Sequence, residues 1–180
     1  KTSPFPTFYA ELIYKSRYSR WLDDENRREN WNETVTRYLD FIKEHVRGKH
    51  GYTIDESLYT ELWGAIYNLE VMPSMRAMMT AGPALARDNT AGYNCSYLPI
   101  DDPKAFDEAM FILLCGTGVG FSVERLFIAK LPEVPDKLFE SRSTIVVRDS
   151  KEGWAKALRQ LIALLYSGEV PQWDTSLVRP

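Results

Sequence analysis

Apolar residues recur at helical spacing through the first part of the chain. From Phe8 to Trp21, and again from Trp31 to Val46, they return every three or four positions, which places them on one face of a helix. A third stretch, ended by Pro73, has the same period. The residues of these stripes are Phe8, Leu12, Ile13, Trp21, Trp31, Val35, Tyr38, Leu39, Ile42, Val46, Leu58, Leu62, Ile66 and Leu69. The pattern predicts a mostly helical region over residues 1–75.

Capping signals accompany these predicted helices. Asn32 has a side-chain oxygen that can accept a backbone N–H at the start of the second helix, and Gly48 and Gly51 favour its termination. Thr53 and Glu56 have the spacing of a capping box, in which each side chain accepts a backbone N–H from the other's position. We therefore expect the third helix to open at Thr53.

The helical period is lost after residue 80. The segment "TAGPALARDNTAGYN" is rich in Gly, Pro, Asn and Thr and predicts a loop. The elements expected after it are a short strand at "CSYLPI", a helix capped by Asp101 or Asp102 and running through Leu114, a glycine loop from Gly116 to Gly120, and an extended segment at "FSVERL".

A second strand and helix follow. The β-branched run in "STIVVRD" predicts a strand, and "SKEGWAKALRQLIALLYSG" predicts an amphipathic helix ended by Gly168, with "DTSLV" as a last candidate strand. Strand, helix, strand in this order predicts a parallel pair joined by a crossover. The sequence therefore predicts the α/β class, with a helical region over 1–75 and an α/β region over 76–180.

Composition narrows the class of protein. With 180 residues, 44% of them hydrophobic and 26% charged, the chain can bury a core. Its formal charge of −3 gives no electrostatic reason to bind nucleic acid or an anionic membrane surface, and no apolar run reaches a membrane span. Two cysteines are too few for a disulfide framework, so we expect a cytoplasmic protein. The first residue, Lys1, and the closing "SLVRP" suggest a fragment.

The densest glycine cluster follows the predicted helix that ends at Leu114. Gly116, Gly118 and Gly120 alternate, which removes side chains from the backbone and lets an anionic group such as a phosphate approach the amide N–H groups. The spacing matches neither the dinucleotide fingerprint nor the P-loop. A structural glycine turn and a phosphate contact both remain open.

The two cysteines occupy different surroundings. Cys95 lies between polar residues at a junction of loop and strand, where a thiol is accessible, so core packing and reactivity are both open. Cys115 ends an apolar helix and is expected in the core. His45 and His50 have no neighbouring cysteine, so no metal site is predicted. The basic and aromatic residues from Tyr14 to Trp21 are expected on an ordinary packed helix rather than in a nucleic-acid site.

An ordered series of segments resembles the catalytic large subunit of ribonucleotide reductases, and specifically the small, adenosylcobalamin-dependent kind. The series is "YKSRYSRWLDDENRRENWNETVTRYL", "MPSMRAMMTAG", "YNCSY", "GTGVGFSVERL", "SKEGWAKAL" and "DTSLVRP". It covers nearly all of the chain, whereas the family's catalytic subunit is much longer. The resemblance implies a helical N-terminal region leading into the first strands and helices of a ten-stranded α/β barrel.

The resemblance also implies roles for five residues. Cys95 matches the redox cysteine on the first barrel strand, which forms a disulfide with a cysteine far downstream as the ribonucleotide is reduced. Asn94 and the backbone of Thr117 and Gly118 match positions that line the substrate site. Asp102, seven residues beyond Cys95, matches the acidic residue that holds an effector deoxynucleoside triphosphate.

Cofactor and partners follow from the same resemblance. It implies adenosylcobalamin, or alternatively a separate metal-containing radical subunit, with neither bound by this segment, and a ribonucleoside di- or triphosphate substrate. A thioredoxin-like reductant would regenerate the thiols. The segment between Cys95 and the glycines is short, which implies a homodimer formed through the helix from Asp102 to Leu114. The radical cysteine and its companions lie outside the chain, so this segment alone is expected to be inactive.

A second class of function is compatible with the same residues. A non-catalytic nucleotide-binding or helical interaction module would use Cys95 and the glycines only to pack its fold. Residues beyond Pro180 would distinguish the two classes, because only the reductase requires a downstream radical cysteine.

Overall fold

The computed structural model describes residues 4–180 and contains two compact units. The first ends at Tyr93, and the second is Asn94–Pro180. The sequence places its division between residues 75 and 76. Residues 76–93, which lie between the predicted and the observed boundary, belong to the first unit, and the short helices in this segment pack on one another.

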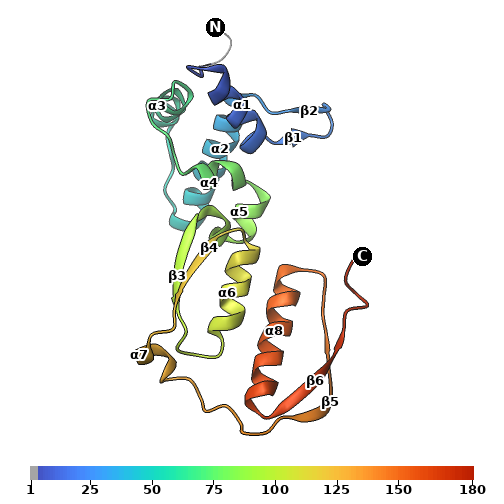
Figure 1. The fold of residues 1–180 in the computed structure, drawn as a ribbon. Coiled ribbons are helices and arrows are strands. Elements are labelled where there is room, and N and C mark those ends of the chain that lie inside the picture. The colour runs from blue at the N-terminus through green and yellow to red at the C-terminus, as the bar shows by residue number, and fades with distance from the viewer. Residues whose placement is uncertain (1–3) are drawn as a thin grey trace. The chain divides into compact units, whose positions relative to one another are not determined.

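The first unit is built from helices with one small hairpin (Figure 1). Its elements are α1 (Phe8–Arg17), β1 (Trp21–Leu22), β2 (Arg27–Arg28), α2 (Trp31–His50), α3 (Glu56–Tyr67), α4 (Met75–Thr80), α5 (Pro83–Arg87) and the 3₁₀ helix η1 (Asn89–Gly92). The apolar stripes meet in one buried cluster, which consists of Tyr14, Trp31, Val35, Leu39, Ile66 and Met78. The helical periodicity identified the members Trp31, Val35, Leu39 and Ile66 correctly. Other residues of the predicted stripes are exposed, namely Phe8, Leu12, Trp21 and Leu62, and the stripes did not include Tyr14 and Met78.

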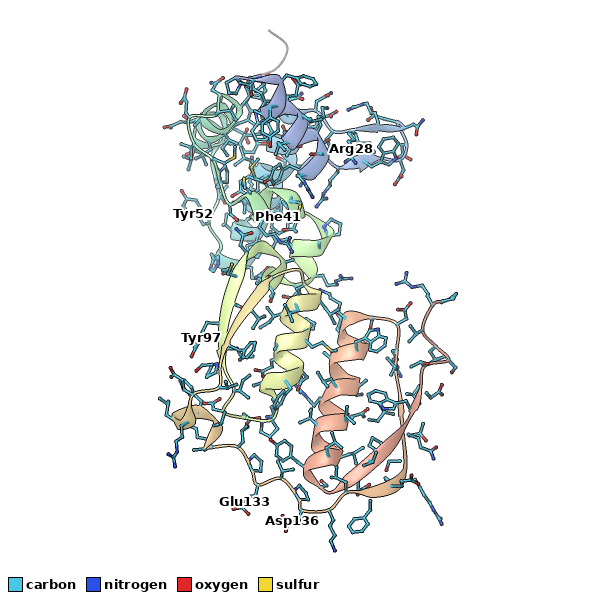
Figure 2. The ribbon with its side chains drawn as sticks, viewed as in Figure 1. Arg28, Phe41, Tyr52, Tyr97, Glu133 and Asp136 are labelled. Carbon is cyan, nitrogen blue, oxygen red and sulfur yellow. The ribbon has the colours of Figure 1, made fainter. Side chains whose placement is uncertain are left out.

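The first helix is shorter than its apolar pattern. It ends at Arg17, and Trp21 lies instead in the hairpin, paired with Arg28 (Figure 2 labels Arg28). Asn26 takes the left-handed conformation, φ 50°, in the hairpin turn, which asparagine tolerates better than most residues. The expectation of one helix through Trp21 is wrong because the hairpin removes that residue from the helical path.

The caps of the second helix differ from those predicted. Asn30 is the N-cap, with its backbone N–H donating to Glu33 Oε2 at 2.6 Å, and Asn32 lies inside the helix. The helix continues through Gly48 and ends at Gly51, whose φ of 66° suits glycine. The prediction for Gly51 is confirmed, and those for Asn32 and Gly48 are wrong.

Two further boundaries are corrected. The third helix opens at Asp55 rather than at Thr53, because the Asp55 carboxylate accepts the Leu58 N–H at 2.8 Å. It ends at Tyr67, before Pro73 is reached. The predicted loop over 80–94 contains α5 and η1, with the proline of α5 at its first turn, where no N–H is required.

The second unit contains two parallel strand pairs, each connected by a helix (Figure 1). Its elements are β3 (Cys95–Pro99), α6 (Ala105–Leu114), β4 (Gly118–Ser122), α7 (Arg125–Ile128), β5 (Phe139–Val146), α8 (Lys151–Tyr166) and β6 (Glu169–Asp174). The pairs are β3 with β4 and β5 with β6. This is the predicted α/β class with its crossovers, and the sheets are open.

Several local expectations in this unit are corrected. β4 begins at Gly118, so Gly118 and Gly120 lie in a strand rather than in a loop. The segment "FSVERL" is extended only at its start, which is the end of β4, and its last two residues are the first residues of α7. The last strand ends at Asp174, the first residue of "DTSLV", and the rest of that segment lies outside it. Gly168, φ 84°, follows α8 as predicted. No helix among residues 4–180 is long and apolar enough to cross a membrane.

Candidate functional site

Asn94, Cys95 and Gly118 lie together at the start of a parallel strand pair. Cys95 is the first residue of β3 and is in register with Gly118, the first residue of β4. The Gly118 N–H donates to the Asn94 carbonyl at 2.9 Å, which holds the two strand ends together. Asn94 and Gly118, which are 24 positions apart in the chain, are therefore neighbours, because β3, α6 and β4 form one crossover unit.

The sheet face that carries Cys95 is open. Side chains alternate along a strand, so Cys95 and Tyr97 share a face, and both are exposed (Figure 2 labels Tyr97). Their partners in β4 are Gly118 and Gly120, which have no side chains. The bare backbone beside Cys95 leaves the thiol accessible to a ligand of substantial size.

The backbone N–H groups near the glycines are engaged within the protein. Gly116 N–H donates to Leu113 O at 2.8 Å, Thr117 N–H to Ile112 O at 3.2 Å, and Gly118 N–H to Asn94 O. Thr117 is only 1% exposed. These three groups do not form an anion-binding cradle, and the glycines provide space beside the thiol instead.

Asp102 lies at the opposite end of β3 from Cys95. It is exposed in the turn before α6, where its Oδ1 accepts the Lys104 N–H at 2.8 Å and Lys104 is the helix N-cap. At about 3.3 Å per extended residue, the far end of β3, after which Asp102 follows, lies roughly 13 Å from Cys95. The structure therefore brings Asn94, Cys95, Thr117 and Gly118 together and leaves Asp102 at a separate place. Neither Asp101 nor Asp102 is the N-cap itself.

The second cysteine is part of the packing, as predicted. Cys115 is buried, and its sulfur lies 3.2 Å from Lys151 Nζ, while the same ammonium lies 5.3 Å from the centroid of the Phe111 ring. This contact joins the end of α6 to the start of α8.

Sequence reasoning missed an ion pair between α6 and α8. Asp107 is 4% exposed, and its Oδ2 accepts from Arg159 Nε at 2.9 Å and Nη2 at 2.6 Å, while Oδ1 has no partner among the described residues. The hydrogen bonds that Arg159 donates to the Asp107 carboxylate raise the pKa of the Arg159 guanidinium. An acidic residue within an apolar helix was the available signal, but its partner is 52 positions away in the sequence.

The other candidate residues have structural surroundings. His45 stacks on Phe41 with ring centroids 5.7 Å apart, and nowhere in residues 4–180 do three His, Cys, Asp or Glu side chains gather closely enough for a metal ion. Tyr14 is buried, with its hydroxyl donating to Glu29 O at 3.1 Å. The basic and aromatic stretch therefore contributes to the core of the first unit.

Known proteins match both units of the chain. The family model "Ribonucleotide reductase alpha domain" matches residues 1–83. Two relatives named adenosylcobalamin-dependent ribonucleoside-triphosphate reductase, from Lacticaseibacillus paracasei and Lactobacillus delbrueckii subsp. bulgaricus, are 33% and 26% identical and match 82% of this chain. The matched region spans 23% of the length of each relative.

A solved structure shares the fold. The crystal structure of a B12-dependent (class II) ribonucleotide reductase matches 94% of this chain and 32% of its own, with a TM-score of 0.78 and 22% identity. The open sheets described above therefore correspond to part of a larger α/β architecture.

Proposed function

Because the chain belongs to the ribonucleotide reductase family, we propose that it is the N-terminal part of a catalytic subunit that reduces ribonucleotides to 2′-deoxyribonucleotides. The observation that carries this proposal is the exposed thiol of Cys95 at the start of β3, next to the bare backbone of Gly118. A ribose can approach the thiol at this point without meeting a side chain from β4.

Cys95 would supply half of the reducing equivalents. Replacement of the 2′-hydroxyl by hydrogen, with loss of water, takes two protons and two electrons, and two thiols release both when they become one disulfide. The second thiol, and the cysteine that carries the radical, belong to protein beyond this segment. Repeated reduction of Cys95 by a thioredoxin-like protein would fit a cytoplasmic location.

Asn94, Thr117 and Gly118 would shape the substrate site. Asn94 is exposed next to Cys95, and its carbonyl holds the start of β4, while the absence of a Gly118 side chain permits close approach. Thr117 is buried and would hold the start of β4 in place. The names of the relatives favour a ribonucleoside triphosphate as substrate.

The radical would come from adenosylcobalamin bound elsewhere in the complete protein. The relatives' names and the solved structure support this cofactor. A hollow between α6 and α8 has a volume of about 540 Å³, which suits a drug-sized ligand and is too small for a corrin with its nucleotide tail. The match spans 23% of the length of the relatives, and the residues that would hold adenosylcobalamin are proposed to lie in the remainder of the complete protein.

The effector and dimer proposals concern the other end of β3. Asp102 is exposed in the turn before α6, where its free oxygen can accept a hydrogen bond from a ribose hydroxyl. α6 also leaves Phe106, Leu113 and Leu114 exposed, by 37%, 57% and 46%. We place a deoxynucleoside triphosphate effector and a two-fold contact here, since a second copy would cover this apolar surface.

Substitution of Cys95 tests the proposed function. In the complete protein, Cys95→Ser should abolish steady-state formation of deoxyribonucleotides, because a hydroxyl cannot form the disulfide. Cys115→Ala is the matched control; it should retain turnover and lower the free energy of unfolding by about 1 kcal/mol or slightly more. Undiminished multiple-turnover activity of Cys95→Ser would exclude the redox role.

A further inference from the structure

A polar hollow lined with aromatic rings lies within the first unit, among α1, α2 and α3. Its volume is about 470 Å³, within the range of small-molecule sites. None of the five residues assigned to the substrate or effector lines it. The hollow therefore has no part in the function proposed above.

Aromatic rings in fixed positions form its walls. Trp31 Nε1 donates to Tyr67 O at 2.9 Å, and Trp63 Nε1 donates to Thr36 Oγ1 at 2.9 Å. The rings of Trp63 and Tyr67 stack with centroids 4.7 Å apart and an interplanar angle of 11°. Because both indole N–H groups are satisfied within the protein, the rings are held in place before any ligand binds, which lowers the entropic cost of stacking a flat molecule.

Polar groups of both kinds line the same hollow. The Glu11 carboxylate accepts no hydrogen bond and forms no ion pair among residues 4–180, and the Asn32 side chain likewise has no partner there. Lys15 Nζ donates to Glu29 O at 2.8 Å and to Asn30 Oδ1 at 3.3 Å. The third N–H of the ammonium can therefore donate to a ligand. A ligand would thus meet an acceptor at Glu11 and donors at Lys15 and Asn32.

We propose that this hollow binds a purine base, with guanine preferred over adenine. Aromatic walls stack on any base. Guanine has adjacent N–H donors on its Watson–Crick edge, which suit the Glu11 carboxylate, and a neighbouring carbonyl, which suits the Lys15 ammonium or the Asn32 amide. The lining contains one ammonium and one carboxylate, a balance that suits a neutral nucleoside better than a triphosphate.

Binding of guanosine to the complete protein tests this proposal, since a nucleoside without phosphates discriminates against the nucleotide sites proposed above. Calorimetry should detect binding of guanosine that is tighter than that of adenosine. Glu11→Gln and Trp63→Leu should each raise the Kd for guanosine at least tenfold. Glu61→Gln is the matched control, because Glu61 is exposed on α3 outside the hollow, and it should leave the Kd unchanged.

Three results would overturn the proposal: no binding of guanosine, equal affinity for adenosine and guanosine, or guanosine binding that Glu11→Gln does not weaken. The third result would assign the nucleoside to a nucleotide site of the second unit. A reduced circular dichroism signal of Trp63→Leu would mean that this variant has lost folded structure. The test then rests on Glu11→Gln alone, because the Glu11 side chain has no partner among residues 4–180 whose loss could destabilise the fold. Ribonucleotide reduction should persist in Glu11→Gln, which separates this test from that of Cys95.

Discussion

Gly116 and Gly118 lie two residues apart but have different backbone conformations. Gly116 has a φ of 84° and follows α6, where a side chain would be strained. Gly118 has no positive φ, and a Cβ built on it would lie 3.6 Å from its nearest neighbour, Asn94 O, an ordinary contact. The fold therefore requires glycine at 116, whereas the requirement at 118 would come from a ligand.

Valine substitutions separate these two requirements. In the complete protein, Gly118→Val should weaken ribonucleotide binding about tenfold or more, because the side chain would fill the space beside Cys95, and it should change the free energy of unfolding by less than about 1 kcal/mol. Gly116→Val should lower that free energy by about 1–2 kcal/mol, since a β-branched residue is strained at positive φ. Calorimetric titration and urea unfolding measure the two effects. Equal nucleotide affinity in Gly118→Val and wild type would show that no ligand requires glycine at position 118.

At the scale of elements, one buried carboxylate connects α2, β2 and α4. Glu29 is 4% exposed, and it accepts from Arg37 at 2.7 and 3.0 Å and from Thr34 at 2.9 Å. Arg37 also donates to the carbonyls of Met78 and Ala81, at 2.9 and 3.0 Å. Burial opposes ionisation of Glu29, but the hydrogen bonds and charge of Arg37 outweigh it, so the pKa of this carboxyl lies below its ordinary value.

This depressed pKa predicts an acid-sensitive first unit. A carboxyl with a lowered folded pKa stabilises the fold above its unfolded pKa of about 4.3, and this contribution is lost as pH falls through the folded pKa. Glu29→Gln should therefore lower the free energy of unfolding at pH 7 by about 3 kcal/mol, because Arg37 is left without its charge partner. It should also flatten the dependence of that free energy on pH below about 4.3. Urea unfolding from pH 7 to 3 is the measurement, with the exposed Glu44→Gln as control, and an unchanged acid slope would contradict the assignment.

At the scale of the whole molecule, assembly should depend on nucleotide. An effector that binds across a two-fold contact stabilises the dimer in proportion to its preference for the assembled state. We predict that a deoxynucleoside triphosphate shifts the complete protein toward dimer in sedimentation velocity, and that Asp102→Ala reduces the shift. Asp102→Asn keeps an oxygen acceptor for the Lys104 N–H, so any loss of the shift in this variant reports the missing charge rather than a damaged turn. A species that remains monomeric at high concentration with saturating effector would exclude this arrangement.

The sequence by itself determined the order and type of most elements. The apolar stripes of α2 and α8, the strand at Cys95–Pro99 and the ends marked by Gly51 and Gly168 are local signals, because each depends on residues within a few positions of one another. The α/β class followed from the order of these elements. The roles of Asn94, Cys95, Thr117, Gly118 and Asp102 came from resemblance to a family, and they remain predictions.

Tertiary structure decided what depends on distant partners. Trp21 leaves the helical path because a hairpin pairs it with Arg28, and Gly118 becomes a strand residue because β3 lies beside it. The bond from Arg159 to Asp107 joins residues 52 positions apart. Local periodicity carries no information about such pairs, since their stability comes from hydrogen bonds and burial that exist only when the chain has folded.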